Sequence, residues 1–296
     1  MSPQRLGILL ALAGMMMFAL NDTLGKWLVA TYSVSQVVLL RSLAALLVLV
    51  VLMWRNRTRL FPVQNPRLQL VRVIASTGEV ACFYYAVRSL PLADVMTYWL
   101  AAPIYVAAVS PWLLGERVGP WRWGAILIGF LGVLVALQPG AGGLSLAVVL
   151  SLIGSAAFAV MMVSARMLRG TPDLALVFWQ TAGAALGAAV FAPLAWVATP
   201  AADLGLLAAL GIIAMVAHLA IARALKLADA ATITPLQYTL LLWAVLFGWL
   251  VFGDVPAPHL AIGAAIIGAS GLVIWLRETR ARRRSGPAAL RPEDLP

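Results

Sequence analysis

The chain has 296 residues, of which 63% are hydrophobic and 11% are charged, and its formal net charge is +10. A soluble domain carries about 25% charged residues, so this composition excludes an ordinary soluble protein and is typical of the membrane class. The single cysteine, Cys82, excludes an internal disulfide and a cysteine-based metal cluster. No histidine-based ligand cluster is visible either, so we expect no metal and no cofactor.

A bilayer-spanning helix needs about 20 mainly apolar residues, and the sequence contains ten such stretches. Their apolar character is nearly continuous rather than alternating, so we predict helices and not barrel strands. The first stretch ends in Asp22 and Lys26 rather than in a small-residue cleavage site, so we predict a retained helix and not a signal peptide. In chain order the predicted spans are 6–28, 34–54, 68–88, 93–114, 121–138, 144–168, 174–197, 204–225, 230–252 and 258–276.

The basic residues are unevenly distributed between the two ends of the predicted spans. When the spans alternate in direction, 18 of the 21 Lys and Arg residues, Arg72 among them, fall at one set of helix ends. This positive-inside pattern predicts a multi-pass protein of the plasma (inner) membrane with both termini in the cytoplasm. The same placement argues against nucleic acid as a partner. The basic tail, 277–296, is expected to be disordered and to contact anionic lipid headgroups.

The chain repeats itself at a separation of roughly 135–140 positions. The repeat divides it into two halves, 1–140 and 141–276, each with five predicted helices. Because five is odd, the second half must enter the membrane upside down, which is the architecture of many secondary transporters. The matching positions are Leu92–Asp94 with Leu227–Asp229, Gly14 and Phe18 with Gly154 and Phe158, and Gly124, Gly129 and Gly132 with Gly263, Gly268 and Gly271. The glycines of the fifth and tenth spans predict close helix packing, within one protomer or between two.

Three segments point to a family. "LPLADVMTYWLAAPIYVAAVSPWLLGERVGPWRWGAILIGFLGVLVALQPG", from Leu90 to Gly140, resembles the end of the first repeat in EamA-type members of the drug/metabolite transporter superfamily. "FALNDTLGKWL" and "VVLLRSLAALL" resemble the first two helices of that family. The resemblance implies an all-α integral membrane protein with ten transmembrane helices in two inverted five-helix repeats. It also implies a central cavity lined by helices one to four and six to nine, and transport of small metabolites, often outward.

Charged residues occur at similar predicted depths in three successive spans of the first half. These are Asp22, Arg41 and Glu79, with Lys26 on the same helix face as Asp22. One interpretation is a structural ion-pair network. The other is a site for a polar substrate group or for a coupled proton, because intramembrane ionisable residues are functional candidates. Arg41 could hold a carboxylate or phosphate bidentately, and Glu79 is the deepest acid.

The second half and the deep aromatics add further candidates. Gln180 corresponds approximately to Arg41, and His218 is a possible proton carrier as well as a possible packing residue. Acids beside Arg41 would suit a zwitterion such as an amino acid, whereas the aromatics would suit a flat heterocycle. The predicted substrate-binding residues are Asp22, Arg41, Glu79, Tyr98, Trp99, Trp179, Gln180, Gln237 and Tyr238, and the predicted proton-coupling residues are Glu79 and His218.

The sequence contains no "GxxxxGK[ST]", "GxSxG" or "HExxH", so no ATP-driven transport and no enzyme activity is predicted. We predict a secondary active transporter, acting as an exporter, that is coupled to protons or works as an exchanger. The alternatives are a passive channel for small solutes, and a membrane-embedded enzyme or structural protein. The expected partners are a small-molecule substrate and membrane lipids, in a monomer or a homodimer.

Overall fold

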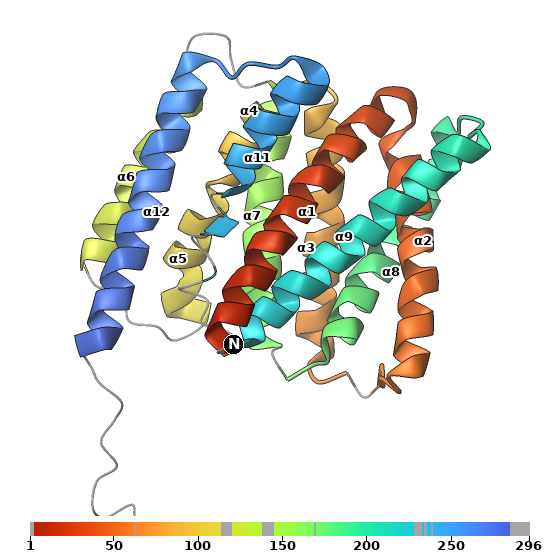
Figure 1. Ribbon diagram of the computed structural model, residues 1–296, viewed down its shortest axis with the longest axis horizontal. Helices are drawn as coiled ribbons and strands as arrows, with labels where there is room; N and C mark the ends of the chain where they lie inside the picture. The colour runs from red at the N-terminus through yellow and green to blue at the C-terminus, as the bar shows by residue number, and fades with distance from the viewer. Residues whose placement is uncertain are drawn as a thin grey trace, which may run out of the picture.

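The computed structural model describes residues 3–61, 63–113, 120–137, 145–168, 170–227, 233, 236–237 and 239–284. These residues form helices and connections without any strand, and the helices stand side by side in one bundle (Figure 1). The helices are α1 (Pro3–Thr31), α2 (Val34–Arg55), α3 (Pro66–Val87), α4 (Leu92–Trp99), α5 (Ala102–Leu113), α6 (Pro120–Leu137), α7 (Leu146–Met167), α8 (Asp173–Phe191) with the 3-10 helix η1 (Ala192–Ala195), α9 (Ala201–Leu227), α11 (Thr239–Phe247) with the π-helix η3 (Gly248–Phe252), and α12 (Pro258–Arg284).

Six of the described helices are long and apolar enough to cross a membrane: α1, α2, α3, α7, α8 with η1, and α9. Shorter apolar helices lie in the other four predicted spans. The predicted class, a helical membrane protein, is confirmed. The predicted number of ten spans stays a prediction.

Local sequence explains where several helices begin and end. Ser33 caps α2, its side chain accepting a hydrogen bond from the backbone of Gln36, and Asn65 caps α3 with Pro66 in the first turn. The predicted span 93–114 is divided into α4 and α5 immediately before Pro103, a residue that cannot donate the helical hydrogen bond. In contrast, α12 continues past the predicted boundary at 276 to Arg284, so the first part of the predicted disordered tail is helical. Residues 285–296 lie outside the described residues.

Helices from the two predicted halves pack against each other throughout the bundle. The main contacts join α1 to α9, α3 to α7, α6 to α12, α2 to α8 and α2 to α9. In Figure 1, α6 and α12 lie together at one edge, and α2 and α8 lie together at the opposite edge. The largest buried cluster contains Tyr84, Trp99, Leu207 and Leu210, so the core itself is shared by helices distant in sequence.

Two of these helix pairs approach closely at glycines. A methyl group at Gly211 in α9 would lie 1.9 Å from the carbonyl oxygen of Arg41 in α2, and one at Gly263 in α12 would lie 2.7 Å from the carbonyl oxygen of Gly132 in α6. The predicted close packing of the glycine pattern is therefore found between α6 and α12 of one chain. It does not extend to Gly124 and Gly268, which face open space.

Replacing Gly211 by alanine should destabilise the protein. The new methyl group would meet backbone rather than a flexible side chain, so relief requires α2 and α9 to separate. We expect Gly211→Ala to lower the free energy of unfolding by about 1–3 kcal/mol. The measurement is the thermal denaturation midpoint of the purified protein in detergent. Gly205→Ala is the matched control, because it lies on the same helix in open space and should be neutral or stabilising. Equal midpoints for the two variants would contradict the close contact.

Candidate functional site

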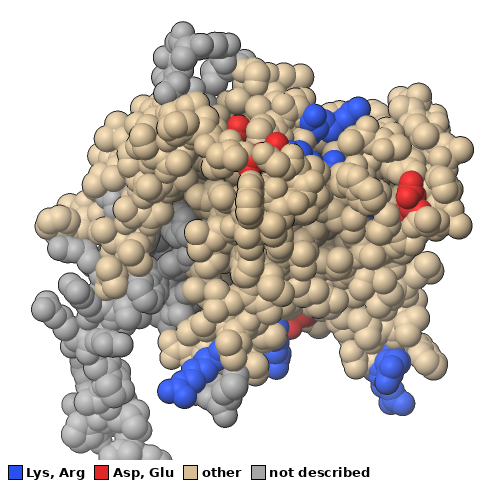
Figure 2. Space-filling view, turned by 45° about the horizontal axis from the view of Figure 1, so that its top comes forward, with Lys and Arg blue, Asp and Glu red and all other residues tan. Residues whose placement is uncertain are grey.

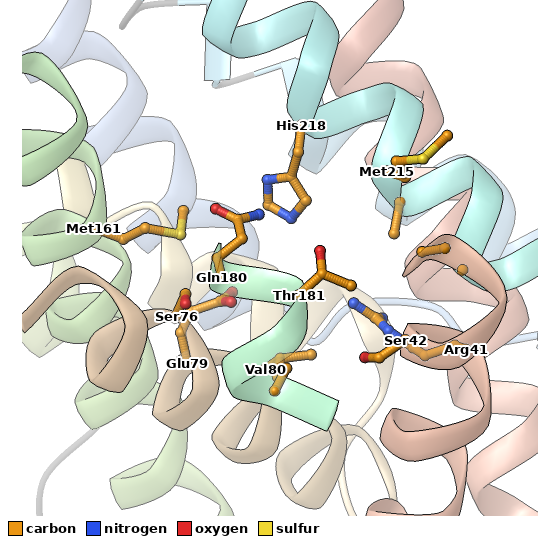
Figure 3. Close-up of a pocket in the computed structure, with 14 residues that line it drawn as sticks. Arg41, Ser42, Ser76, Glu79, Val80, Met161, Gln180, Thr181, Met215 and His218 are labelled. Carbon is orange, nitrogen blue, oxygen red and sulfur yellow. The ribbon is translucent and has the colours of Figure 1, made fainter. Parts of the chain in front are cut away.

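Three adjoining cavities lie among the packed helices, and His218 of α9 contributes to all of them. The first, which we call the central cavity, has a volume of about 40 Å³. In Figure 3 the side chains of Glu79, Gln180, Thr181 and His218 turn toward a common space, with Arg41 approaching from α2. The cavity is thus built from α2, α3, α7, α8 and α9, with contributions from both predicted halves. Its lining is Arg41, Ser42, Ala45, Ser76, Glu79, Val80, Met161, Gln180, Thr181, Ala184, Gly211, Ala214, Met215 and His218.

The second cavity, which we call the aromatic cavity, has a volume of about 50 Å³ and shares Arg41, Glu79 and His218 with the central cavity. It brings together the predicted cluster of charged residues, because Asp22 also lines it. Its other walls are largely aromatic. The Trp99 ring packs over Gly154 and meets Phe83 edge-on, at 5.4 Å between ring centroids. The complete lining is Phe18, Asn21, Asp22, Arg41, Glu79, Val80, Phe83, Tyr84, Met96, Trp99, Phe158, Ala214, His218 and Leu240.

Arg41 is held by neutral groups. Its guanidinium donates hydrogen bonds to the hydroxyl of Tyr84 and, at 3.4 Å, to the side-chain oxygen of Asn21. It also lies over the Tyr84 ring, 5.3 Å from the centroid. Asp22 accepts a hydrogen bond from Asn21 at 2.9 Å. Among the described residues Arg41 forms no ion pair, so the structural alternative of a Glu79–Arg41 pair finds no support in this arrangement.

The third cavity, which we call the basal cavity, is far larger, with a volume of about 610 Å³. It lies at the end of the bundle where α1 begins and α9 ends, which we call the basal end (Figure 1). It meets the central cavity at Met161 and His218. The lining is Gln4, Arg72, Met161, Met162, Ala165, Arg166, Leu176, His218, Ile221, Ala222, Leu225, Lys226 and Leu227.

The opposite end of the bundle, which we call the far end, is bridged by polar contacts between the predicted halves. Lys26 of α1 forms an ion pair with Asp254 at 2.6 Å and lies 4.4 Å from the centroid of the Phe252 ring. The Tyr32 hydroxyl donates a hydrogen bond to Asp203. Gln36, fully buried, exchanges hydrogen bonds with the backbone of Val197 at 2.7 and 2.9 Å. These contacts tie the predicted halves together at the far end, whereas the large cavity lies at the basal end.

The Lys26–Asp254 contact corrects one expectation. Lys26 lies four residues after Asp22 and was expected to act with it, yet its partner is 228 positions away. Figure 2 shows acidic side chains on the upper face of the molecule beside a few basic ones, and Lys and Arg along the lower edge. The ion pair with Asp254 therefore places Lys26 among the polar contacts of the far end, and not in the cluster of Asp22, Arg41 and Glu79.

Breaking the Lys26–Asp254 pair should open the far end more often. In a variant that lacks the native thiol, Cys82→Ala, the substitution Thr181→Cys places a single thiol in the central cavity. A membrane-impermeant maleimide, applied to one side of sealed vesicles at a time, then reports from which side the cavity can be reached. We expect labelling from the basal side only, and added labelling from the far side once Lys26→Ala is introduced. The charge-reversed double variant Lys26→Asp/Asp254→Lys should restore the original pattern. Unchanged labelling in Lys26→Ala would show that the pair does not hold this end closed.

Other predicted site residues have different surroundings. Tyr98 is buried against Ala136 of α6 and Leu260 of α12, away from the charged cluster. Trp179 packs edge-on against Phe61 at 5.7 Å. Gln237 is buried, and Tyr238 lies outside the described residues. The cavities thus unite Asp22, Arg41, Glu79, Trp99, Gln180 and His218 from the predicted set.

Arg72 was missed as a site residue, because it was counted among the basic residues at helix ends. The structure buries it in α3, where it donates a hydrogen bond to Gln180 at 2.7 Å. Arg72 lies inside the predicted span 68–88, and a charged residue within a span is a candidate for a functional site, so its position could have identified it. In the described part of the chain, no group of three or more His, Cys, Asp or Glu residues could hold a metal.

These observations define a multi-pass helical membrane protein with a line of cavities between its helices. The sequence model of the EamA-like transporter family matches residues 5–138 and again 145–276, and the chain belongs to this family. It is 30% identical over 227 residues to a riboflavin transporter of Rhizobium johnstonii, covering 74% of this chain and 73% of that protein. It is 27% identical over 267 residues to a pseudopaline exporter of Pseudomonas aeruginosa, covering 88% and 93%. A crystal structure with 20% sequence identity shares the fold, with a TM-score of 0.63 over 93% of this chain and 99% of that one.

Proposed function

We propose that the protein is a secondary active transporter, acting as an exporter, of a small polar or amphipathic metabolite. Its substrate would bind at the central and aromatic cavities. The observation that carries the proposal is the line of three cavities, which share His218 and run from the basal end to the charged cluster, while an ion pair bridges the far end. A carrier that alternates its access needs such an arrangement: a site between two bundles, open to one side at a time.

We further propose ten spans arranged as two inverted repeats, 1–140 and 141–276. The packing of the helices supports this. The contact of Arg41 with Gly211 and the hydrogen bond of Arg72 with Gln180 are equivalent to each other under the repeat. Position 41 corresponds to 180 and position 72 to 211, in both cases 139 positions apart. The same separation relates Glu79 to His218, which both line the central cavity. In the proposed register His218 is therefore the counterpart of Glu79.

The basal end is proposed to face the cytoplasm, with both termini on that side. Exposed arginines of the loop between α2 and α3 and of the first turn of α3 support this orientation: Arg55, Arg57, Arg59 and Arg67. Reporter fusions truncated after Thr31 and after Thr199, both at the far end, should read as outside the cytoplasm. A cytoplasmic signal at Thr31 would reverse the proposed orientation.

The lining chemistry supports a substrate with both a polar group and an apolar or flat part. Arg41 and Gln180 can hydrogen-bond a polar group, whereas Trp99, Phe83 and Phe158 offer faces for stacking. The named substrates of the two relatives, riboflavin and pseudopaline, guide the choice of compounds to test. A passive channel is the alternative, and the closed far end and the small central cavity argue against it.

The direct test is a thermal-shift screen of the purified protein against a metabolite library that contains riboflavin. A ligand at 100 times its dissociation constant stabilises the folded state by about 2.7 kcal/mol, which is a readily measured shift. We expect a stabilising compound whose effect is lost in Arg41→Ala. A stabilising effect that persists in Arg41→Ala would show that the compound does not bind in the central and aromatic cavities.

A further inference from the structure

We propose that Arg72 is an anion-binding residue of the basal cavity, and that the transported metabolite carries a carboxylate or phosphate group that Arg72 contacts. This inference rests on the proposed transport function and adds the chemical class of the substrate. It concerns a residue outside the cluster of Asp22, Arg41 and Glu79, one that is hydrogen-bonded to two residues of the central cavity, Met161 and Gln180.

The partners of Arg72 leave its charge uncompensated. The side chain is 4% exposed. One terminal nitrogen donates to the side-chain oxygen of Gln180 at 2.7 Å, and the other donates to the backbone oxygen of Met161 at 3.3 Å. Both acceptors are neutral, and the Nε–H of Arg72 has no hydrogen-bond partner. Among the described residues Arg72 forms no ion pair.

A buried guanidinium with only neutral partners lacks an anion to balance its charge and an acceptor for its Nε–H. Charged side chains within membrane helices almost always pair with an opposite charge or face a water-filled cavity. The guanidinium has five N–H donors in a planar fork, which suits the oxygens of a carboxylate or phosphate. Gln180 and Met161 satisfy part of this fork and hold its orientation, so an anion can complete it without rearranging the side chain.

The cavity around Arg72 has the size and charge for such a ligand. Its volume of about 610 Å³ falls within the range of roughly 300–1,000 Å³ that is usual for small-molecule pockets. The ionisable residues of its lining are Arg72, Arg166, Lys226 and His218, and no acid is among the described lining residues. Lys226 pairs with Asp173 at 2.6 Å, outside the cavity lining. The charge of Arg72, whose hydrogen-bond partners are neutral, should therefore attract an anion into this cavity.

The rest of the lining indicates the shape of the ligand. Met161, Met162, Leu176, Ile221 and Leu225 supply the apolar part of the lining, which we call the apolar wall. Methionine side chains adapt to irregular apolar ligands. The arrangement fits a metabolite with an anionic group at Arg72 and an apolar body against this wall, and it matches the amphipathic substrate proposed for the central cavity.

The test is the thermal denaturation midpoint of the purified full chain in the presence of named anions. The probes are succinate and glycerol 3-phosphate, with succinamide and glycerol as neutral controls of similar size. Three variants are compared with the wild type: Arg72→Gln, which removes the charge; Gln180→Glu, which supplies an internal carboxylate at 2.7 Å; and Arg67→Gln, which removes an exposed charge from the same helix. A parallel series with phosphatidylglycerol tests whether the anion comes from lipid.

We expect at least one soluble anion, and neither neutral compound, to raise the midpoint of the wild type and of Arg67→Gln by about 2–4 °C. The shift should vanish in Arg72→Gln and in Gln180→Glu; the latter should remain folded, since its carboxylate neutralises Arg72. An anion shift that persists in Gln180→Glu overturns the inference, as does an Arg72-dependent shift with phosphatidylglycerol alone. Because binding in detergent requires no transport, an Arg72-dependent anion shift without transport would defeat the proposed function alone.

Discussion

Arg41→Lys is expected to lower the rate of substrate transport by about tenfold to a hundredfold while the protein stays folded. Lysine keeps the positive charge but loses the planar fork that can donate two parallel hydrogen bonds to a carboxylate or phosphate. A hydrogen bond to a charged group contributes about 1.5–3 kcal/mol, which corresponds to this loss of rate if the contact is made during transport. The fork is available because Tyr84 and Asn21, both neutral, are the partners that hold Arg41.

The measurement is the initial rate of transport in proteoliposomes, normalised to inserted protein. Arg55→Lys is the matched control, because Arg55 is an exposed residue at the end of the same helix. It should transport at the wild-type rate, and both variants should elute as a single folded species. Wild-type transport by Arg41→Lys would show that Arg41 does not bind the substrate through its fork.

Glu79→Gln is expected to abolish transport driven by a pH gradient and to leave exchange of substrate across the membrane largely intact. In the proposed secondary transport the driving force is a gradient rather than ATP, in line with the lack of a "GxxxxGK[ST]" motif. Glu79 lines both the central and the aromatic cavity and can exchange a proton with water there. Glutamine keeps the shape of the side chain and removes its titration, which separates proton coupling from substrate binding.

A structural role of Glu79 predicts a different result. If Glu79 mainly stabilised the packing of α3, glutamine would lower the denaturation midpoint and reduce gradient-driven transport and exchange together. Full gradient-driven transport by Glu79→Gln would end the coupling hypothesis. His218 would then be the residue to test, because it lines all three cavities and is the counterpart of Glu79 in the proposed repeat.

The positions of helices, and the depth of a residue along its helix, could be predicted from the sequence because they depend on neighbouring residues in the chain. Long apolar runs predicted the helices, and α2 begins and ends within one residue of the predicted 34–54. Residues at matching depths on successive helices predicted that Asp22, Arg41 and Glu79 would meet, and they line one cavity. Depth can be counted along a helix from its ends, so this inference needed no knowledge of how the helices pack.

Features set by helix rotation and by distant partners could not be predicted. Depth alone does not tell which way Tyr98 faces, and α4 turns it toward α6 and α12. Lys26 was placed by the helical i, i+4 rule beside Asp22, whereas its partner Asp254 comes from the other half of the chain. Arg72 read as a topology signal because its burial depends on α7 and α8 packing over α3.

The central claim is that this chain is a carrier, with its substrate site in the cavities around Arg41, Glu79 and His218. Counterflow in proteoliposomes tests it most directly. Vesicles are loaded with the unlabelled compound that most stabilises the protein in the thermal-shift screen, and a trace of labelled compound is added outside without ATP or an ion gradient. A carrier should accumulate the label transiently above its equilibrium level, and Arg41→Ala should not. Label that only equilibrates, as through a passive channel, or equal accumulation by Arg41→Ala, would contradict the account.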